Sequence, residues 1–390
     1  MTSRETLIHD LGPVRFKSLT MSNFLSYRSA TLDFSDLTAL IGPNGSGKSN
    51  AISAMKLLRD IALHGLPVAL SRRGGYDQLR HRSTGRPYEP GLRIEFTVAG
   101  GHPCFYELRL SSLKGKRYEV KEERGSVLVG SRELKFQHAK GVFSAEEVST
   151  LPEPIERMDR TIHIPQGQSI LSLQPSFGVS IVSAVLQSMQ VLEINPTRAA
   201  ELQDPSPVSE FEPDGSNIAS IVENFDQHER AQLAQLLAAV VPGIARIEVR
   251  HLADKVTVVF VQNTGKANRE FFAKQMSDGT LRVFGILVAI LQSPRPTILL
   301  IEEPEVAIHL GALQTLVEIL RGEVDDIQIV ITTHSADIVD SVDLDDLRVV
   351  WVTDGVSQIS KVAEHARGPI IDGLITPGAL LRADALDPSL

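Results

Sequence analysis

The segment from residue 42 to residue 49 constrains the fold more than any other part of the chain. It holds three glycines and ends in a lysine and a serine: Gly42, Pro43, Asn44, Gly45, Ser46, Gly47, Lys48 and Ser49, followed by Asn50. The apolar run 37–41 before it is typical of a buried strand, and the apolar residues of 52–62 after it recur at helical spacing. The sequence therefore predicts a strand, a glycine loop and a helix, in that order.

This loop fits the pattern of a phosphate-binding loop. Glycines let the backbone turn its N–H groups toward phosphate oxygens, and the start of the following helix adds partial positive charge. In this pattern Lys48 reaches the β- and γ-phosphates and Ser49 binds Mg²⁺. An ordinary glycine turn is the alternative, but the flanking strand and helix disfavour it. We expect the chain to bind a nucleoside triphosphate.

A pair of glutamates, Glu302 and Glu303, follows the apolar run 298–301 and precedes Pro304 and Glu305. At the end of a buried strand, one carboxylate can hold Mg²⁺ through water while its neighbour orients an attacking water. Taken alone, two glutamates before a proline are usually a solvated strand end. The phosphate-binding loop in the same chain makes the functional interpretation the better one.

Two further motifs carry polar residues at the ends of predicted elements. His334 follows the apolar strand pattern 328–332, where it can hydrogen-bond a γ-phosphate, although a lone histidine there is more often a packing or capping residue. Ser277 and Gly279 open the apolar helix pattern 281–291. A serine and a glycine at a helix start can bind an anion, but they also make an ordinary N-cap.

The remaining patterns predict an α/β fold. Apolar runs at 297–301, 328–332 and 348–352 are separated by helix-length segments, which indicates a buried parallel sheet. From residue 92 to about 138, short alternating segments punctuated by glycines predict an antiparallel meander. Helical patterns follow, with Asp226 and Glu229 at the spacing of a capping box. Residues 244–262 then predict a hairpin.

Composition excludes several classes of protein. The chain has 48 acidic and 39 basic residues and a net charge of −9, so nucleic acid would need a local basic patch. A single cysteine, Cys104, excludes an intramolecular disulfide and a cysteine-built zinc site, and it fits a reducing compartment. The longest apolar stretch, 284–291, is far shorter than the roughly 20 residues that cross a bilayer. We expect a soluble, cytoplasmic protein.

Together, the four motifs resemble the head of ABC-type ATPases, in particular the RecF/SMC/OLD-like branch. IGPNGSGKSN and the upstream NFLSY are similar to that branch, and MSDGTLR stands where the ABC signature usually reads LSGGQ. The glutamate motif EEPE followed by His309 resembles a group of bacterial ATPases of the same branch. The resemblance spans about residues 14–360. It implies an ABC-type P-loop ATPase head with a mixed or parallel sheet, an antiparallel β subdomain and a helical insertion lobe.

The resemblance implies roles at the nucleotide. Lys48 and Ser49 correspond to the Walker A lysine and the magnesium ligand, and the glycine loop from Gly42 to Asn50 holds the phosphates. Glu302 replaces the Walker B aspartate as a metal ligand, and Glu303 is the catalytic carboxylate. The implied substrate is ATP with Mg²⁺, hydrolysed to ADP and phosphate.

The resemblance also implies a switch and a dimer. His334 corresponds to the switch histidine, which completes a catalytic set with Lys48 and Glu303. Ser277 and Gly279 would contact the γ-phosphate of an ATP held by a second copy, because ABC heads sandwich two ATP molecules between them. Asp278 weakens the signature match. The glutamine that usually approaches Mg²⁺ has three candidates, namely Gln78, Gln137 and Gln166, and the adenine-contacting residue is not identified.

We expect four parts along the chain. Residues 14–150 form the first part of the head with the antiparallel subdomain, 151–243 a mainly helical lobe, 244–360 the second part of the head and 361–390 a tail. The heptad repeats of a coiled coil are absent, and the sequence after the last predicted strand is too short for a TOPRIM nuclease. Effector chemistry is therefore expected on a separate protein, with a nuclease as one candidate.

An arginine-rich loop follows the first predicted helix: Arg72, Arg73, Arg80, Arg82 and Arg86. It can hold nucleic-acid phosphates, but a solvated loop, or arginines that touch ATP or acidic residues across a dimer, is the better interpretation. Three roles stay open. The first is a homodimeric ATP-driven switch or sensor in bacterial antiphage defence, the second a RecF-like DNA-repair ATPase, and the third an ATP-binding scaffold with negligible turnover.

Overall fold

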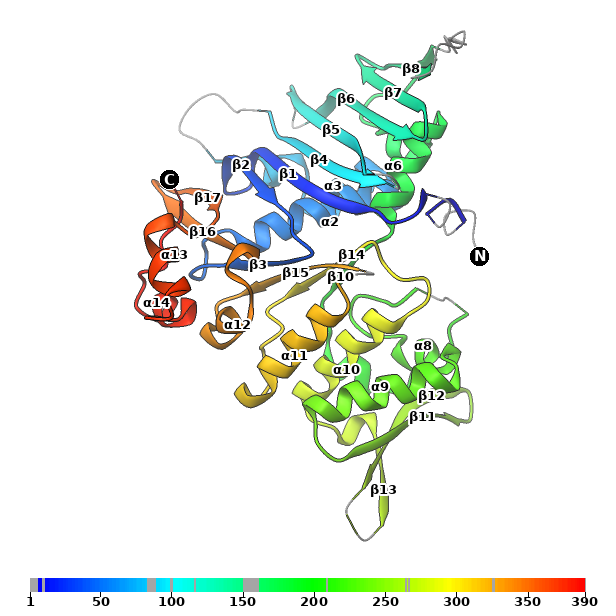
Figure 1. The fold of residues 1–390 in the computed structure, drawn as a ribbon. Coiled ribbons are helices and arrows are strands. Elements are labelled where there is room, and N and C mark those ends of the chain that lie inside the picture. The colour runs from blue at the N-terminus through cyan, green and yellow to red at the C-terminus, as the bar shows by residue number, and fades with distance from the viewer. Residues whose placement is uncertain are drawn as a thin grey trace.

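Three β-sheets organise the chain in this computed structural model (Figure 1). The structure describes residues 6–8, 11–82, 89–98, 101–115, 117–149, 161–207, 210–263, 265, 267–324 and 327–389. Helices cover the faces of the sheets that carry apolar side chains. The predicted α/β class, with a mixed sheet beside an antiparallel one, is confirmed.

The central sheet has the strand order β10-β14-β15-β3-β16-β17. Its strands are β3 (Leu37–Ile41), β10 (Met189–Leu192), β14 (Ile298–Glu302), β15 (Gln328–Thr333), β16 (Leu347–Thr353) and β17 (Val356–Ser360). Every neighbouring pair is parallel except β16 and β17. Leu300 and Val330 face one apolar cluster, whereas Leu299 and Ile329 face another. Burial on both faces explains why these strands are continuous apolar runs.

Helices lie on both faces of this sheet. On one face lies α2 (Lys48–His64), which begins directly after the glycine loop. On the other face lie α10 (Asp278–Leu291) and α11 (Leu310–Gly322), as Figure 1 shows. Helix α2 presents an apolar stripe to the sheet and polar residues elsewhere, as its sequence pattern predicts, and α11 does the same, whereas α10 is buried on almost all sides.

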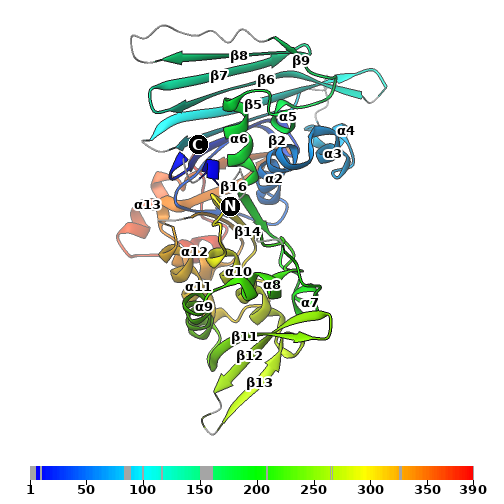
Figure 2. The same cartoon turned by 90° about the vertical axis from the view of Figure 1, so that its right-hand side faces the viewer.

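The antiparallel sheet is larger than the predicted meander. Its strands, in spatial order, are β2 (Tyr27–Asp33), β1 (Arg15–Phe24), β4 (Gly91–Val98), β5 (His102–Leu113), β6 (Arg117–Val129), β7 (Arg132–Ala139), β8 (Val142–Ser149) and β9 (Ile162–His163). Its inner face packs on α2, α5 (Ile170–Leu173) and α6 (Phe177–Gln187), as Figure 2 shows. Between α2 and β4, where a loop was expected, lie the short helices α3 (Leu66–Ser71) and α4 (Tyr76–Leu79).

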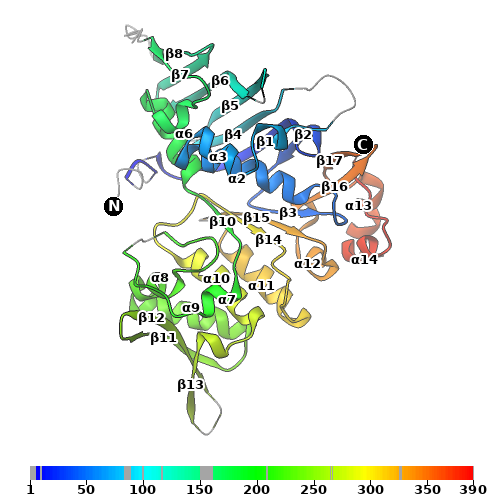
Figure 3. The ribbon, with the colours of Figure 1, turned by 180° about the vertical axis from the view of Figure 1, so that it is seen from behind.

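A third sheet forms the lower lobe of Figures 1 and 3. Its elements are α7 (Pro196–Ala200), α8 (Ile218–Asn224), α9 (Gln227–Val240), β11 (Ile244–Leu252), β12 (Lys255–Asn263), β13 (Asn268–Phe272) and η1 (Ala273–Gln275). The predicted capping box of Asp226 and Glu229 is present at the start of α9. Strand β10 lies within residues 151–243 yet belongs to the central sheet, and the four-part division of the chain stays a prediction.

The last part of the chain packs beside the end of the central sheet. Its elements are α12 (Ala336–Ser341), η2 (Leu344–Asp346), α13 (Glu364–Ile371) and α14 (Pro377–Arg382). Helix α14 packs on α12, where the Gly378 amide donates to Asp340 Oδ1 at 2.6 Å. Across the described ranges, we find no helix with both the length and the apolar character that a membrane span requires.

Candidate nucleotide site

Three of the predicted motifs meet at one edge of the central sheet. Strands β14, β15 and β3 are neighbours and run parallel, so their carboxyl ends lie at the same edge. The register pairs Glu302 with Thr332 and Thr333 with Ile41. The glycine loop, the glutamate pair and His334 each begin where one of these strands ends. The topology therefore brings together residues that are almost 300 positions apart in the sequence.

Two glycines of the loop occupy positions that no other residue fits. Gly42 has φ +148° and Gly47 has φ +117°, in the region that disfavours side chains. A Cβ on Gly42 would lie 2.1 Å from the Val350 carbonyl oxygen, and one on Gly47 would lie 2.5 Å from Ser357 Oγ. Gly45 has φ +77° but open space around it. The loop is therefore pressed against β16 and β17 on one side and open on the other.

Hydroxyl groups from distant segments fix the loop backbone. Tyr27 donates its hydroxyl to the Gly47 carbonyl at 2.8 Å, and Ser357 donates to the Ser46 carbonyl at 2.6 Å. Burial raises the pKa of Tyr27, so its hydroxyl stays protonated and available as a donor. Asn50 Nδ2 donates to Ser26 Oγ at 2.7 Å. These bonds hold two loop carbonyls on the protein side, and the Ser46 amide donates to the Pro43 carbonyl at 3.2 Å within the loop.

Lys48 is buried and bends back onto its own loop. Its ammonium donates to the carbonyls of Gly42 at 2.7 Å and Pro43 at 3.1 Å. Burial lowers the pKa of Lys48, while the charges of Glu303 and Glu305 oppose this shift. The Ser46 hydroxyl is buried without a hydrogen-bond partner among the described residues. Asn44 and Ser49 are exposed.

Glu302 is engaged by a lysine that sequence reasoning missed. Lys56, two turns along α2, donates to Glu302 at 2.6 Å and to Glu193 at 2.5 Å. Burial alone would lower the pKa of Lys56, but the hydrogen bonds to both carboxylates raise it. Glu193 follows β10, the strand beside β14, so it leaves the sheet at the same edge. Lys56 therefore lies between Glu193 and Glu302, the predicted metal ligand.

Glu303 sits at a strained turn. Its φ is +47°, uncommon for a residue with a side chain, and its amide donates to the Thr332 carbonyl at 2.9 Å. The carboxylate is 41% exposed, and its Oε1 lies 3.7 Å from His334 Nδ1. The carboxylate is thus accessible, lies next to the histidine and is close enough to Lys48 for its charge to act on that lysine.

Ser277 and Gly279 lie at the amino end of α10, apart from these motifs. Ser277 Oγ accepts from the Thr280 amide at 3.2 Å, which is an N-cap. A Cβ on Gly279 would lie 2.0 Å from the Ala307 carbonyl oxygen, so the helix start is packed against the segment after β14. His309 caps α11 through the Gly311 amide. Within one copy, the serine and the glycine have structural roles.

The arginine-rich loop is partly neutralised. Arg73 pairs with Asp60 at 2.7 Å, and Arg80 pairs with Asp77 at 3.0 Å. Arg72 and Arg82 are exposed, whereas Arg86 lies outside the described residues. Two of the arginines are therefore charge-balanced locally by acidic residues, and binding of nucleic acid by this segment stays a prediction.

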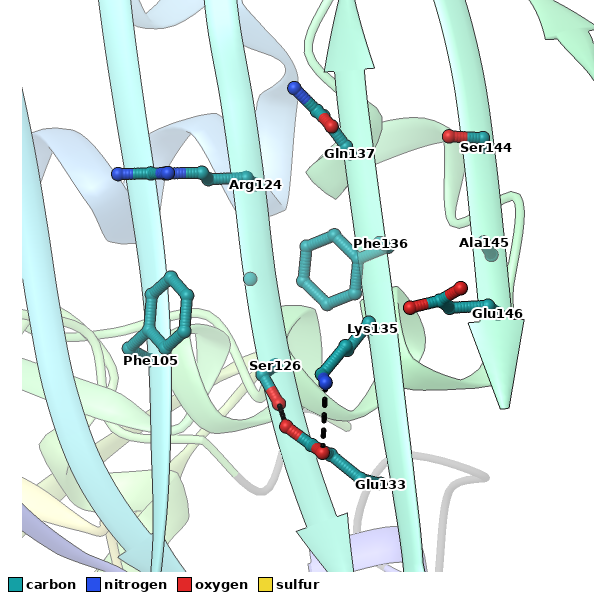
Figure 4. A pocket seen from close by; sticks show the side chains of 11 residues that line it. Phe105, Arg124, Ser126, Glu133, Lys135, Phe136, Gln137, Ser144, Ala145 and Glu146 are labelled. Carbon is teal, nitrogen blue, oxygen red and sulfur yellow. Dashed lines mark hydrogen bonds and ion pairs between the residues drawn. The ribbon is translucent and has the colours of Figure 1, made fainter. Parts of the chain in front are cut away.

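Two of the three candidate glutamines, Gln137 and Gln166, lie on segments away from the edge where the motifs meet. Gln137 lies on β7, in a hollow on the outer face of the antiparallel sheet (Figure 4). Gln78 lies on α4. Gln166 lies in the segment before α5, and its neighbour Gln168 approaches Gly65 at the carboxyl end of α2. Because α2 is about 25 Å long and Ser49 is at its amino end, this segment is remote from the predicted metal ligand Ser49.

Comparison with known proteins agrees with this architecture. The protein family described as "AAA domain, putative AbiEii toxin, Type IV TA system" matches residues 37–340, most of the chain. The chain belongs to this family. The match begins at β3 and ends within α12, so it includes the glycine loop, the glutamate pair and His334. No curated protein matches the sequence significantly.

The solved structures similar to this AAA-domain protein include SMC heads. An SMC head bound to the C-terminal winged-helix domain of ScpA has a TM-score of 0.58 and 15% identity, covering 91% of this chain and 99% of that one. The SMC head from Pyrococcus furiosus has a TM-score of 0.56 and 13% identity, covering 93% of this chain and 99% of that one. The SMC head from Pyrococcus yayanosii has a TM-score of 0.52 and 12% identity, covering 93% of this chain and 99% of that one. The fold is that of an ABC-type P-loop head, and the expected resemblance is confirmed.

Proposed function

We propose that this chain hydrolyses ATP with Mg²⁺, that two copies close around ATP, and that the resulting switch controls a separate effector in bacterial antiphage defence. The observation that carries the enzymatic part is the convergence of Lys48, Glu303 and His334 at one edge of the central sheet. These side chains supply a cation for phosphates, a carboxylate for a water and a hydrogen-bonding imidazole.

The residues present fit a nucleoside triphosphate. The glycine loop is packed against the protein on one side and open on the other. The buried Ser46 hydroxyl has no hydrogen-bond partner among the described residues, and a bound nucleotide can supply one. The ammonium group of Lys48 donates to two loop carbonyls, and it can replace these acceptors with phosphate oxygens when a nucleotide binds. Asn44 and Ser49 are accessible from solvent.

The residues also fit Mg²⁺ held in the usual way. Among the described residues, no group of three or more His, Cys, Asp or Glu side chains is arranged to hold a metal ion, whereas Mg²⁺ bound with ATP needs few protein ligands. Ser49 and Glu302 would hold the ion, which neutralises charge on the phosphates when bound. Glu302 must then exchange its contact with Lys56. Glu303 orients the attacking water, and His334 donates a hydrogen bond to the γ-phosphate.

Closure by a second copy gives Ser277 and Gly279 a further role. They cap and pack α10 within one copy, and Ser277 is exposed. In the proposed dimer they contact the γ-phosphate held by the other copy. The SMC-head fold supports this arrangement, and the toxin–antitoxin description of the family supports a role in defence. The effector is a separate protein in this proposal.

Analytical ultracentrifugation of the Glu303→Gln variant tests the proposal. With ATP and Mg²⁺ we expect a dimer, whereas the same variant carrying Ser277→Arg stays monomeric because the larger, charged side chain blocks the closed interface. A monomer in the Glu303→Gln variant at saturating ATP would contradict dimerisation around ATP. Adding duplex DNA separates the repair role: DNA-stimulated turnover that is lost in Arg72→Glu/Arg82→Glu would replace the defence role with the RecF-like one.

A further inference from the structure

Glu305 is a buried carboxylate beside the proposed catalytic residues. Its side chain is 10% exposed, compared with 41% for Glu303. Its Oε1 accepts the Thr333 hydroxyl at 2.7 Å and the His334 amide at 3.2 Å. These two hydrogen bonds hold the turn that follows β15 and therefore fix the backbone from which the His334 ring projects.

The second oxygen of this carboxylate is incompletely satisfied. Glu305 Oε2 is buried and has no hydrogen-bond partner among the described residues. A buried carboxylate oxygen without a donor costs free energy, and such atoms persist where a ligand or a movement supplies the missing donor. The charge of Glu305 also acts on Lys48, against the effect of burial on the pKa of that lysine. The Glu305 carboxylate is therefore close enough to the glycine loop for its charge to act on Lys48.

His334 lies between two possible acceptors. Its Nδ1 is 3.7 Å from Glu303 Oε1 and 3.8 Å from Glu305 Oε1, beyond hydrogen-bond length to either. If Glu303 accepted the imidazole N–H, its carboxylate would be less available to a water. Glu305 is better suited because it is buried, already bonded to the histidine backbone and has an oxygen without a donor.

We propose that Glu305 is a positioning residue for ATP hydrolysis: in the ATP-bound state it accepts the Nδ1–H of His334. This inference rests on the proposed function. The contact holds the Nδ1–H, so that a ring carrying both protons can donate its Nε2–H to the γ-phosphate, and it leaves the Glu303 carboxylate for the water. A carboxylate that accepts from one nitrogen of a histidine fixes the orientation of the ring and favours its protonated form.

The Glu305→Gln variant isolates this contact. Its amide oxygen can still accept from Thr333 and His334 N, but an NH₂ group replaces the unpaired oxygen and cannot accept the imidazole proton. We expect kcat to fall about tenfold or more, with the KM for ATP within twofold and an unchanged melting temperature. Glu318→Gln, an exposed glutamate on α11, is the matched control and should keep the wild-type kcat.

A double-mutant cycle separates positioning from a structural role. If Glu305 acts through His334, Glu305→Gln adds little further loss of kcat to His334→Ala. Additive losses, an unchanged kcat in Glu305→Gln, or a parallel fall of kcat and melting temperature would overturn the inference. Glu303→Gln, measured beside these variants, tells the two proposals apart. Turnover that needs Glu303 but not Glu305 would contradict the role of Glu305 alone. Wild-type protein without turnover would contradict both that role and the proposed ATPase function.

Discussion

Ser357 donates its hydroxyl to the main-chain carbonyl of Ser46 at 2.6 Å, across 311 residues of sequence. The hydrogen bond joins β17, at the end of the central sheet, to the glycine loop. Both partners are buried, and the adjacent Gly47 leaves no room for a Cβ beside Ser357. The last strand of the sheet is therefore part of the nucleotide site, because it determines which way the peptides of the loop face.

Removal of this hydroxyl should weaken ATP binding. In Ser357→Ala the Ser46 carbonyl loses its buried donor, which costs about 1 to 2 kcal/mol, and the loop is freer to turn its N–H groups away. We expect a roughly fivefold to thirtyfold higher Kd for ATP by isothermal titration calorimetry. Ser360→Ala removes an exposed hydroxyl from the same strand and serves as the control. An unchanged Kd in Ser357→Ala would show that the bond does not shape the loop.

Lys56 should compete with Mg²⁺ for Glu302. Its ammonium lies between Glu302 and Glu193, and its pKa is raised, so it is fully charged at neutral pH. In Lys56→Met the two carboxylates lose this cation, and we expect the Mg²⁺ concentration for half-maximal ATPase activity to fall several-fold. Lys56→Arg keeps the charge and should behave like the wild type. A higher Mg²⁺ requirement in Lys56→Met would mean that the lysine supports the metal site.

Stability should depend on pH through Glu107, far from the nucleotide site. Burial alone would raise the pKa of this carboxyl, but hydrogen bonds from Arg124 and the charge of Arg109 lower it. A folded-state pKa below the unfolded value stabilises the fold above the ordinary glutamate pKa of about 4.3, and this contribution is lost as the pH falls through the folded value.

Glu107→Gln tests this dependence by urea unfolding. We expect a loss of about 1 to 2 kcal/mol at pH 7, because the arginines are half exposed, and a smaller difference from the wild type at pH 3. Glu146→Gln, on β8 of the same sheet, should show no comparable pH dependence. A difference between Glu107→Gln and the wild type that stays constant from pH 7 to pH 3 would contradict the account.

Much of the site could be predicted from sequence because its parts are local motifs. The strand, glycine loop and helix appear as predicted, and the ends of β14 and β15 place Glu302 and His334 at the same edge. An apolar run with a polar residue after it predicts this placement without knowledge of distant contacts, since parallel strands share one carboxyl edge.

The contacts that complete the site could not be predicted. Lys56 has the spacing of an exposed helix residue, and its two partners lie at the carboxyl ends of β10 and β14. Ser357 is one of many serines, and its contact depends on the register of β17. Strand β10 has four residues and follows α6 closely, so its apolar side chains resemble a continuation of the helix.

The most direct measurement is ATP hydrolysis by the purified protein with Mg²⁺ beside the Glu303→Gln variant. We expect steady turnover by the wild type, whereas Glu303→Gln binds ATP with similar affinity and hydrolyses it at least a hundredfold more slowly, because the water loses its orienting carboxylate. Equal turnover in the two proteins, or ATP binding without hydrolysis in the wild type, would contradict this expectation.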